Sequence, residues 1–415
     1  MSRARDLLRR LSGGLHLDRL AAIEEKVGRF GRAQREDLAQ QRRRLEELSD
    51  AVAARATSAA LGELRQAVDS LRASVAAQDR VVAEAFERVR LFDEMAVDDR
   101  RFARRMEHLA ARGRRIIVGP WTGEVGFELL YWVPFVRWVA AKYGLARERL
   151  VVVSRGGAER WYGALAGSYV DVFSFVSTDE FRAATEDAKK QRRVGEFDAR
   201  LVERLRGTGG LGDADLLHPG TMYRLFMPFW RELATMARVE AYADYARLDG
   251  GDDPVLRELP ADYVAARFYF SDCFPDSAAN REFVGATLDA ISRQLPVVVL
   301  NTPFAIDDHR DAAVAGGRVI SLAGRMAPER NLALQTAVIG RARAFVGTYG
   351  GYSYLAPFCG VPSLAFHSAP TFKAHHLHLA QRVFERLGGA TVVPLDTAAL
   401  PVVRLALAGA LASTP

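Results

Sequence analysis

Short apolar segments alternate with longer amphipathic segments throughout the second half of this chain. The apolar segments have the length of buried strands, and the segments between them carry the three-and-four spacing of helices. The expected strands are residues 263–270, 297–300, 319–322, 344–346, 363–366 and 391–393, and the expected helices are 281–293, 328–341, 352–358, 373–387 and 397–411. Such alternation predicts a parallel, doubly wound sheet, because each helix carries the chain back across the sheet.

A shorter α/β region precedes this half. The expected elements are strands at 116–118, 150–153 and 170–175, helices at 127–143 and 221–238, and a polar linker at 242–260. The first strand, helix and second strand form a β-α-β unit. We therefore expect an α/β fold with two Rossmann-like domains, residues 113–245 and 246–415. Ligands of open α/β sheets bind at the carboxyl ends of the strands, so the two domains should face a common cleft.

Residues 1–112 carry a different pattern. No proline interrupts residues 17–109, and apolar residues recur three and four positions apart, which predicts long helices. One heptad row consists of Leu61, Val68, Val75, Val82 and Val89. The register slips near residues 53–60, so at least two helical pieces are expected. An apolar stripe on a long helix needs a cover, which is either a second copy in a coiled coil or the globular part of the chain. A coiled-coil homo-oligomer is our first expectation.

Composition excludes several classes of protein. The chain has 415 residues, of which 49% are hydrophobic and 26% charged, so it is not a disordered protein. No apolar run reaches membrane-spanning length, the N-terminus lacks the apolar core of a signal peptide, and two cysteines cannot form a disulfide framework. We expect a cytoplasmic protein.

The basic excess lies in the first 115 residues, which hold 25 Lys and Arg against 19 Asp and Glu. The first eleven residues combine four arginines with three leucines. This start either contacts an anionic membrane surface, which would place the protein at the inner face of the membrane, or is a solvated helix end. Nucleic acid is not expected as a partner, because no aromatic residues interleave the arginines.

A glycine turn follows the expected strand 344–346. Gly350 and Gly351 come just before a helix that begins near Tyr352. Free N–H groups and the positive end of the helix dipole would converge there, and a diphosphate suits that geometry. The alternative is an ordinary strand-to-helix turn of another α/β protein.

This region resembles the donor-binding half of two-Rossmann (GT-B) glycosyltransferases, such as the heptosyltransferases of lipopolysaccharide assembly. The resemblance is carried by Ser321-Leu322-Ala323-Gly324, Phe345-Val346-Gly347, Gly350-Gly351, Leu355-Ala356 and Gly360-Val361-Pro362, and it departs from those enzymes at Thr348-Tyr349. As architecture it extends over residues 113–415, with an acceptor domain followed by a donor domain. It implies transfer of a sugar from a nucleotide-diphosphate donor to a glycan or lipid-linked acceptor. It further implies inversion by direct displacement, with neither metal nor cofactor.

The loop within residues 119–132 is the second candidate region. In the enzymes that this chain resembles, the first loop of the N-terminal domain faces the cleft and can supply the catalytic base. Glu124 is our first choice for that base and Glu128 the second, because a carboxylate can accept the proton of an attacking sugar hydroxyl. Glu124 could instead support the start of its helix through the dipole. The residues expected on the acceptor side are Trp121, Gly123 and Gly126.

The leaving diphosphate needs cations or hydrogen-bond donors on the C-terminal domain. Arg267, Arg325 and Lys373 lie near predicted strand ends or in the loops beyond them. Ser353 could donate to phosphate or cap its own helix. Asp213 and Asp215 have the spacing of a metal-binding pair but lie away from the donor half, so no metal is expected.

Two other functions stay open. Polysaccharide pyruvyltransferases and sugar-nucleotide epimerases use the same two-domain scaffold, and a fold does not determine the chemistry. The chain could also be a non-catalytic coiled-coil scaffold that carries a degenerate transferase domain.

Overall fold

A computed structural model describes residues 15–53, 58–186, 191–208, 210–306, 309–313, 318–369 and 371–400. The chain divides into two compact units, Met1–Val97 and Asp98–Pro415. The basic start of the chain, for which membrane contact was considered, lies outside the described residues. Among the residues described, no helix is both long enough and apolar enough to cross a membrane.

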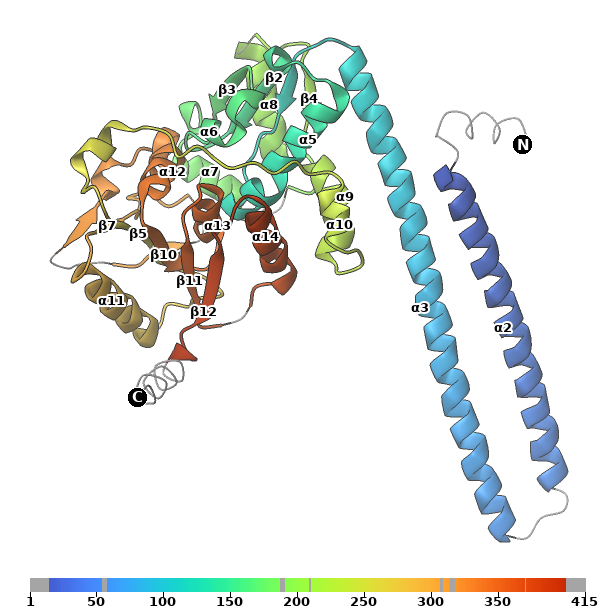
Figure 1. Ribbon diagram of the computed structural model, residues 1–415. Coiled ribbons are helices and arrows are strands. Elements are labelled where there is room, and N and C mark those ends of the chain that lie inside the picture. The colour runs from blue at the N-terminus through green and yellow to red at the C-terminus, as the bar shows by residue number, and fades with distance from the viewer. Residues whose placement is uncertain are drawn as a thin grey trace. The chain divides into compact units, whose positions relative to one another are not determined.

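The first unit is a helical hairpin (Figure 1). Its helices are α2, Leu15–Ala53, and α3, Ser58–Ala111, which continues into the second unit. Arg42 pairs with Asp79 at 3.1 Å, and the Arg35 guanidinium lies 5.2 Å from the centre of the Phe86 ring, so the two helices run antiparallel. The expected long helices are confirmed. Helix α2 ends at Ala53 and α3 begins at Ser58, within residues 53–60, where the heptad register slips.

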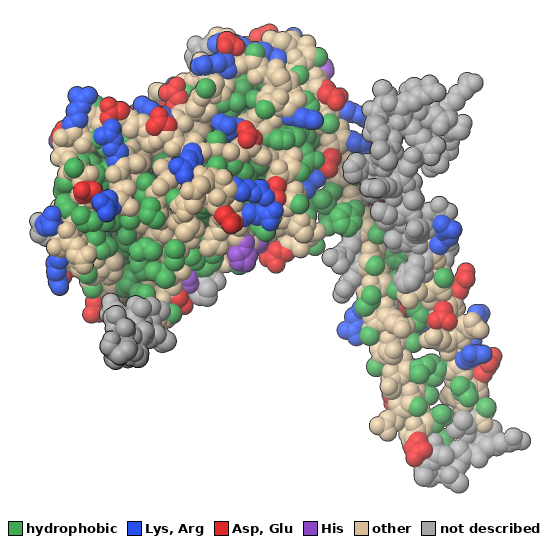
Figure 2. Space-filling model, viewed as in Figure 1, with side chains coloured by type: hydrophobic (Ala, Val, Ile, Leu, Met, Phe, Trp, Pro, Cys, Tyr) green, Lys and Arg blue, Asp and Glu red, His purple; other side chains and the backbone are tan. Residues whose placement is uncertain are grey.

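The hairpin covers only part of its apolar surface. Leu38 of α2 and Val75 of α3 are buried. Leu48, Leu71 and Phe92 are 56%, 44% and 54% exposed. Apolar side chains are accordingly visible at the surface of the hairpin (Figure 2).

The last turns of α3 belong to the second unit. Phe102, Met106 and Leu109 are buried in its core, and the Phe102 ring lies 5.7 Å from that of Phe135. The globular part therefore begins before residue 113, where the composition of the sequence first changes.

The second unit contains two parallel sheets, which confirms the expected fold class. Sheet A has the order β3-β2-β1-β4, with all neighbours parallel. Its strands are β1, Ile116–Val118; β2, Leu150–Ser154; β3, Ser168–Asp171; and β4, Asp215–Leu217. The expected third strand, 170–175, was placed too late, because a 3₁₀ turn begins at Val172. Strand β4 was not expected from the sequence.

The expected helix 127–143 of this half consists of three joined segments. They are α4, Val125–Phe127; a π-helical turn η1, Glu128–Trp132; and α5, Val133–Tyr143. The expected helix 221–238 was wrong in its length. Instead α9, Gly220–Trp230, ends soon after Pro228, and α10, Ala237–Glu240, follows. The other helices of this half are α6, Glu159–Tyr162; α7, Thr178–Thr185; and α8, Glu196–Thr208.

Sheet B has the order β12-β11-β10-β5-β7-β9 and is parallel throughout. Its strands are β5, Val264–Arg267; β7, Val297–Val299; β9, Val319–Ser321; β10, Ala344–Thr348; β11, Ser363–His367; and β12, Val392–Asp396. A two-stranded ribbon pairs β6, Tyr269–Phe270, with β8, Arg310–Asp311. The helices are α11, Ala278–Ser292; α12, Asn331–Arg341; α13, Gly351–Phe358; and α14, Ala374–Arg386. Most of the expected helix 397–411 lies outside the described residues.

The halves built on the two sheets are packed together. Trp161 of α6 donates from Nε1 to Thr336 Oγ1 of α12 at 2.9 Å. The Gly156 carbonyl accepts from the backbone N–H groups of Leu332 and Ala333, at the start of the same helix. One continuous hydrophobic core includes side chains from both halves.

Candidate functional site

A cleft of about 530 Å³ lies between the two halves, where strands of both sheets end. Sheet A contributes the loop after β1, Arg155 after β2, and part of α7. Sheet B contributes the residues after β5 and β10 and a loop before α14. The lining residues are Thr122, Gly123, Glu124, Val125, Gly126, Arg155, Phe181, Arg182, Thr185, Glu186, Tyr269, Ser271, Asp272, Cys273, Ile306, His309, Tyr349, Gly350, Gly351, Tyr352, Thr371 and Phe372. This is the edge at which open α/β sheets bind ligands.

The glycine turn after β10 forms the C-terminal wall of the cleft. Gly350 is the N-cap of α13, and Gly351 is the first helical residue. The hydroxyl of Ser353 donates to the Gly350 carbonyl at 2.7 Å and accepts from the Gly350 N–H at 3.2 Å. Ser353 therefore caps its own helix, which was the alternative to phosphate binding considered for it.

The glycines of this wall are also packed closely. A Cβ added at Gly351 would lie 2.6 Å from the backbone nitrogen of Gly126, and one at Gly350 would lie 1.9 Å from the Tyr269 hydroxyl. Side chains at these positions would displace their neighbours. The starts of α4 and α13 thus meet at the cleft because both carry glycine there.

Glu124 also lines the cleft, from the loop after β1. It is the N-cap of α4, its backbone is extended with φ −67° and ψ 144°, and its side chain makes no capping hydrogen bond to the helix. The side chain is exposed. Glu124 thus reaches the same space as the α13 turn.

Glu128 lies behind the cleft wall and does not line the cleft. Its side chain is fully buried, and its Oε1 accepts from the Ser154 hydroxyl at 2.5 Å and the Tyr162 hydroxyl at 2.7 Å. Burial raises the pKa of Glu128 to about 7, although the Arg155 charge and these two hydrogen bonds act in the opposite direction. The position of this side chain does not suit contact with an acceptor.

Arg155 is a cleft residue that the sequence analysis did not single out. Its side chain is buried, and Nη2 donates to the Gly123 carbonyl, next to Glu124. Its position directly after β2 and before two glycines was the signal that could have identified it, because polar residues at carboxyl strand ends lie at the ligand edge.

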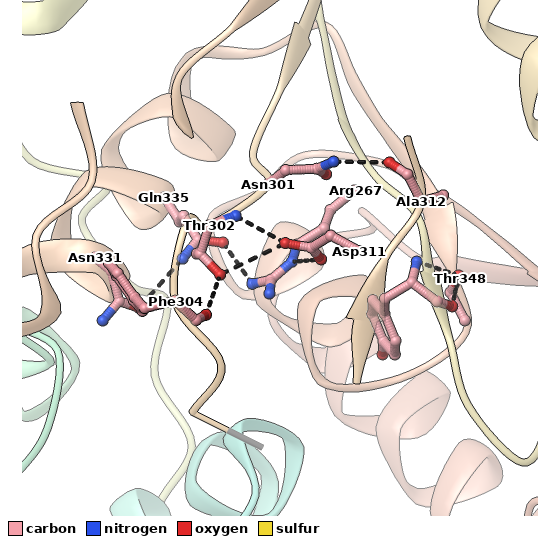
Figure 3. Close-up of polar contacts among 10 residues, drawn as sticks. Arg267, Asn301, Thr302, Phe304, Asp311, Ala312, Asn331, Gln335 and Thr348 are labelled. Carbon is pink, nitrogen blue, oxygen red and sulfur yellow. Dashed lines mark hydrogen bonds and ion pairs between the residues drawn. The ribbon is translucent and has the colours of Figure 1, made fainter. Parts of the chain in front are cut away.

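Arg267 lines a smaller cavity of about 300 Å³, which shares Tyr352 and Arg155 with the cleft. Its guanidinium donates to Asp311 at 3.1 Å and to Gln335 at 2.8 Å (Figure 3). The guanidinium also lies 4.1 Å from the centre of the Tyr352 ring. Asp311 in turn accepts from the N–H of Thr302. This network orients Tyr352, the first aromatic residue of α13.

Six predicted site residues do not line the cleft, namely Glu128, Arg267 and Ser353, described above, and Arg325, Lys373 and Trp121. Arg325 is exposed and pairs with Glu258 at 2.7 Å. Lys373 donates from Nζ to the Trp230 carbonyl at 3.3 Å. Trp121 is fully buried and stacks on Trp132. The acidic pair that had metal-binding spacing is also engaged elsewhere, because Asp213 and Asp215 form ion pairs with Arg114 and Arg112.

Comparisons with solved structures return glycosyltransferases. The chain is similar to a glycosyl transferase family 9 structure from Veillonella parvula, with 14% identity, 71% of this chain and 89% of that chain covered, and a TM-score of 0.40. It is also similar to E. coli ADP-heptose lipopolysaccharide heptosyltransferase II, with 13% identity, coverage of 68% and 91%, and a TM-score of 0.40. For the E. coli heptosyltransferase WaaC with ADP, the identity is 15%, the coverage 71% and 98%, and the TM-score 0.34.

Searches against protein-family models and against curated proteins found no match. At these identities and TM-scores, the likeness to the solved structures concerns general architecture only.

Proposed function

We propose that this chain is a glycosyltransferase that uses a nucleotide-diphosphate sugar. The observation that supports it most is the cleft itself, in which the exposed Glu124 carboxylate and the glycine turn at the start of α13 line one space of about 530 Å³. A carboxylate and the N-terminal end of a helix in one cleft suit a reaction that removes a proton at one place and releases an anion near the positive end of the helix dipole.

In the proposed reaction, Glu124 accepts the proton of an acceptor hydroxyl. The hydroxyl oxygen forms a bond to the anomeric carbon as the bond from that carbon to the diphosphate breaks. The nucleoside diphosphate leaves with the electron pair of the broken bond. Displacement from the opposite face inverts the anomeric configuration, and no metal is assigned to the step.

The donor is proposed to bind on the sheet B side. Gly350, Gly351 and Tyr352 line the cleft there. Arg267 is proposed to act through Tyr352, because its charge lies over that ring and is already paired with Asp311. Arg325 and Lys373 are left out of the proposed donor site, since neither lines the cleft.

The acceptor is proposed to be a glycan or lipid-linked glycan that enters on the sheet A side. Arg182 and Thr185 of α7 line the cleft there. We further propose that the protein works in the cytoplasm, and that its helical hairpin associates with a second copy.

The test is release of nucleoside diphosphate from a panel of sugar nucleotides, with and without an added glycolipid fraction. Release that depends on the acceptor supports transfer, whereas conversion of the donor without an acceptor favours an epimerase. Glu124→Gln should lower turnover on the order of a hundredfold or more while nucleotide affinity is kept. Glu186→Gln is the matched control, because Glu186 is another exposed carboxylate of the same cleft. Near-normal turnover of Glu124→Gln would contradict its role as the base.

A further inference from the structure

Gln191 lies beneath the loop that carries Glu124. Its side chain is buried, with 5% of its surface exposed. Oε1 accepts from the Thr122 N–H at 2.9 Å, and Nε2 donates to the Pro120 carbonyl at 2.8 Å. One amide group thus joins the backbone on both sides of Trp121. These hydrogen bonds add to the one that the Trp121 N–H donates to the Val153 carbonyl of β2 at 2.9 Å.

Asp198 and His218 hold this amide in one orientation. Asp198 Oδ1 accepts from Gln191 Nε2 at 3.0 Å, so the amide nitrogen faces Asp198 and its oxygen faces Thr122. Asp198 Oδ2 accepts from the Gly195 N–H at 3.1 Å and lies 3.1 Å from His218 Nε2. His218 Nδ1 accepts from the Gly220 N–H at 3.0 Å, so its proton is on Nε2 and points to Asp198.

Every polar atom of the Gln191 amide that faces the loop is therefore matched to a backbone group. A reversed amide would place its NH₂ against the Thr122 N–H and its oxygen against Asp198. Two donors and two acceptors would then face each other, which is unfavourable in a buried site. The Asp198 carboxylate and the two backbone groups of the loop thus favour the same orientation of the Gln191 amide.

A further hydrogen bond holds the loop at Gly123, one residue nearer to Glu124 than Thr122. Arg155 donates to the Gly123 carbonyl, from the side of β2. Between them, Gln191 and Arg155 fix the N–H of Thr122 and the carbonyl of Gly123. Glu124 follows directly, and its side chain is the exposed carboxylate of the cleft wall.

We propose that Gln191, oriented by Asp198 and His218, is a positioning residue that sets the place of the Glu124 carboxylate in the cleft. The inference rests on the proposed function in so far as Glu124 is the base. Gln191 itself does not line the cleft, so its effect on a reaction would pass through the loop.

Hydrogen exchange of residues 119–126 tests, without any substrate, whether Gln191 holds this loop. Gln191→Met keeps the length of the side chain but removes both hydrogen bonds to the loop. Exchange in this segment should become about tenfold faster or more, as expected when the bonds that hold a loop are lost. Asp198→Asn, which weakens the support of the amide by removing the carboxylate that accepts from Gln191, Gly195 and His218, should increase exchange in the same segment. Gln381→Met is the control, because the Gln381 side chain donates to the Val392 carbonyl in the other half.

Turnover measured on the same variants separates positioning from mere support of the fold. Gln191→Met should lower kcat by about tenfold or more with the KM for the donor unchanged, because the base is displaced while the donor wall is intact. Unchanged exchange in residues 119–126 of folded variants would contradict the claim that Gln191 holds the loop. Faster exchange with an unchanged kcat would overturn the positioning role. Failure of the wild-type chain to transfer any sugar would contradict the proposed function alone, because the exchange measurement needs no substrate.

Discussion

The buried carboxyl of Glu128 should make the stability of the globular unit fall as pH rises. Its pKa is raised by burial from an ordinary 4.5 to about 7 in the folded chain. Between these two values the folded state holds a proton that the unfolded state has released. Stability therefore decreases with pH through this window, and the loss continues until the folded carboxyl is itself ionised.

The size of the effect follows from the two pKa values. Between pH 5 and pH 8, a single carboxyl with these pKa values lowers the stability of the folded state by about 2–3 kcal/mol. Glu128→Gln keeps the shape, and the amide oxygen can still accept from Ser154 and Tyr162. Its NH₂ group replaces Oε2, which has no hydrogen-bond partner among the described residues. The cost of burying that NH₂ group without an acceptor does not change with pH.

Urea unfolding of the wild type and Glu128→Gln at pH 5 and pH 8 measures this difference. All five tryptophans lie in residues 98–415, so their fluorescence reports on the globular unit. The free energy of unfolding of the variant should rise by about 2–3 kcal/mol relative to that of the wild type on going from pH 5 to pH 8. Glu159→Gln, an exposed site, controls for the change in net charge. Equal pH dependence in the wild type and Glu128→Gln would refute the reasoning.

Three further predictions concern packing and association. Gly351→Ala should lower the free energy of unfolding by about 1–3 kcal/mol, because the new methyl group would meet the Gly126 backbone. Gly285→Ala, with open space around it in α11, should raise the free energy of unfolding by about 0.5–1 kcal/mol. Urea unfolding compares the two variants, and equal effects would contradict the close packing at Gly351. Deletion of residues 1–97 should leave a cooperatively unfolding protein. Deletion of residues 1–112 should abolish cooperative unfolding, because it removes three buried core side chains of α3. Circular dichroism during heating compares the two shortened proteins, and equal melting would refute a boundary between residues 97 and 98. The full-length chain should be a dimer by light scattering, and Leu71→Glu should shift it toward monomer by charging the exposed face of the hairpin; a monomeric wild type at micromolar concentration would contradict this.

The alternation of strands and helices was enough to predict both sheets. Strand 116–118 and helix 352–358 were placed to within one residue of β1 and α13. Strand β3 was placed too late because Val172 and Phe173 are apolar but belong to a turn. The Asp171 carboxylate accepts from the Phe173 N–H and ends the strand there. Strand β4 has only three residues, half-buried at its start and preceded by glycines, so it left almost no periodic signal.

Site residues were harder to predict because alternation does not give the order of strands. Arg267 ends β5, which is the neighbour of β10, and it therefore reaches the α13 helix. Arg325 follows β9, and β5 and β7 separate that edge strand from β10. Both arginines occupy strand ends in the sequence, yet only one lies near the glycine turn. The direction of a side chain is a further unknown, as Lys373 illustrates by bonding to the Trp230 carbonyl.

The pairing of Gln191 with the Glu124 loop joins residues that are far apart in the sequence. Residues 192–194, which follow Gln191, are two arginines and a valine, are all exposed in the structure and carry no periodic pattern. No local rule assigns a buried role to a glutamine in such a segment. Only the folded arrangement of α8 and β1 brings the amide to the loop.

Hydrogen exchange in the presence of nucleoside diphosphates tests the central claim most directly. The intact chain is compared with and without a saturating concentration of UDP, GDP, ADP or CDP. At least one of them should slow exchange in residues 349–352 and 122–126, which line the cleft from both halves, and leave the helical hairpin unchanged. Unchanged exchange in both segments with all four nucleotides would contradict the proposal that this cleft binds a nucleotide sugar.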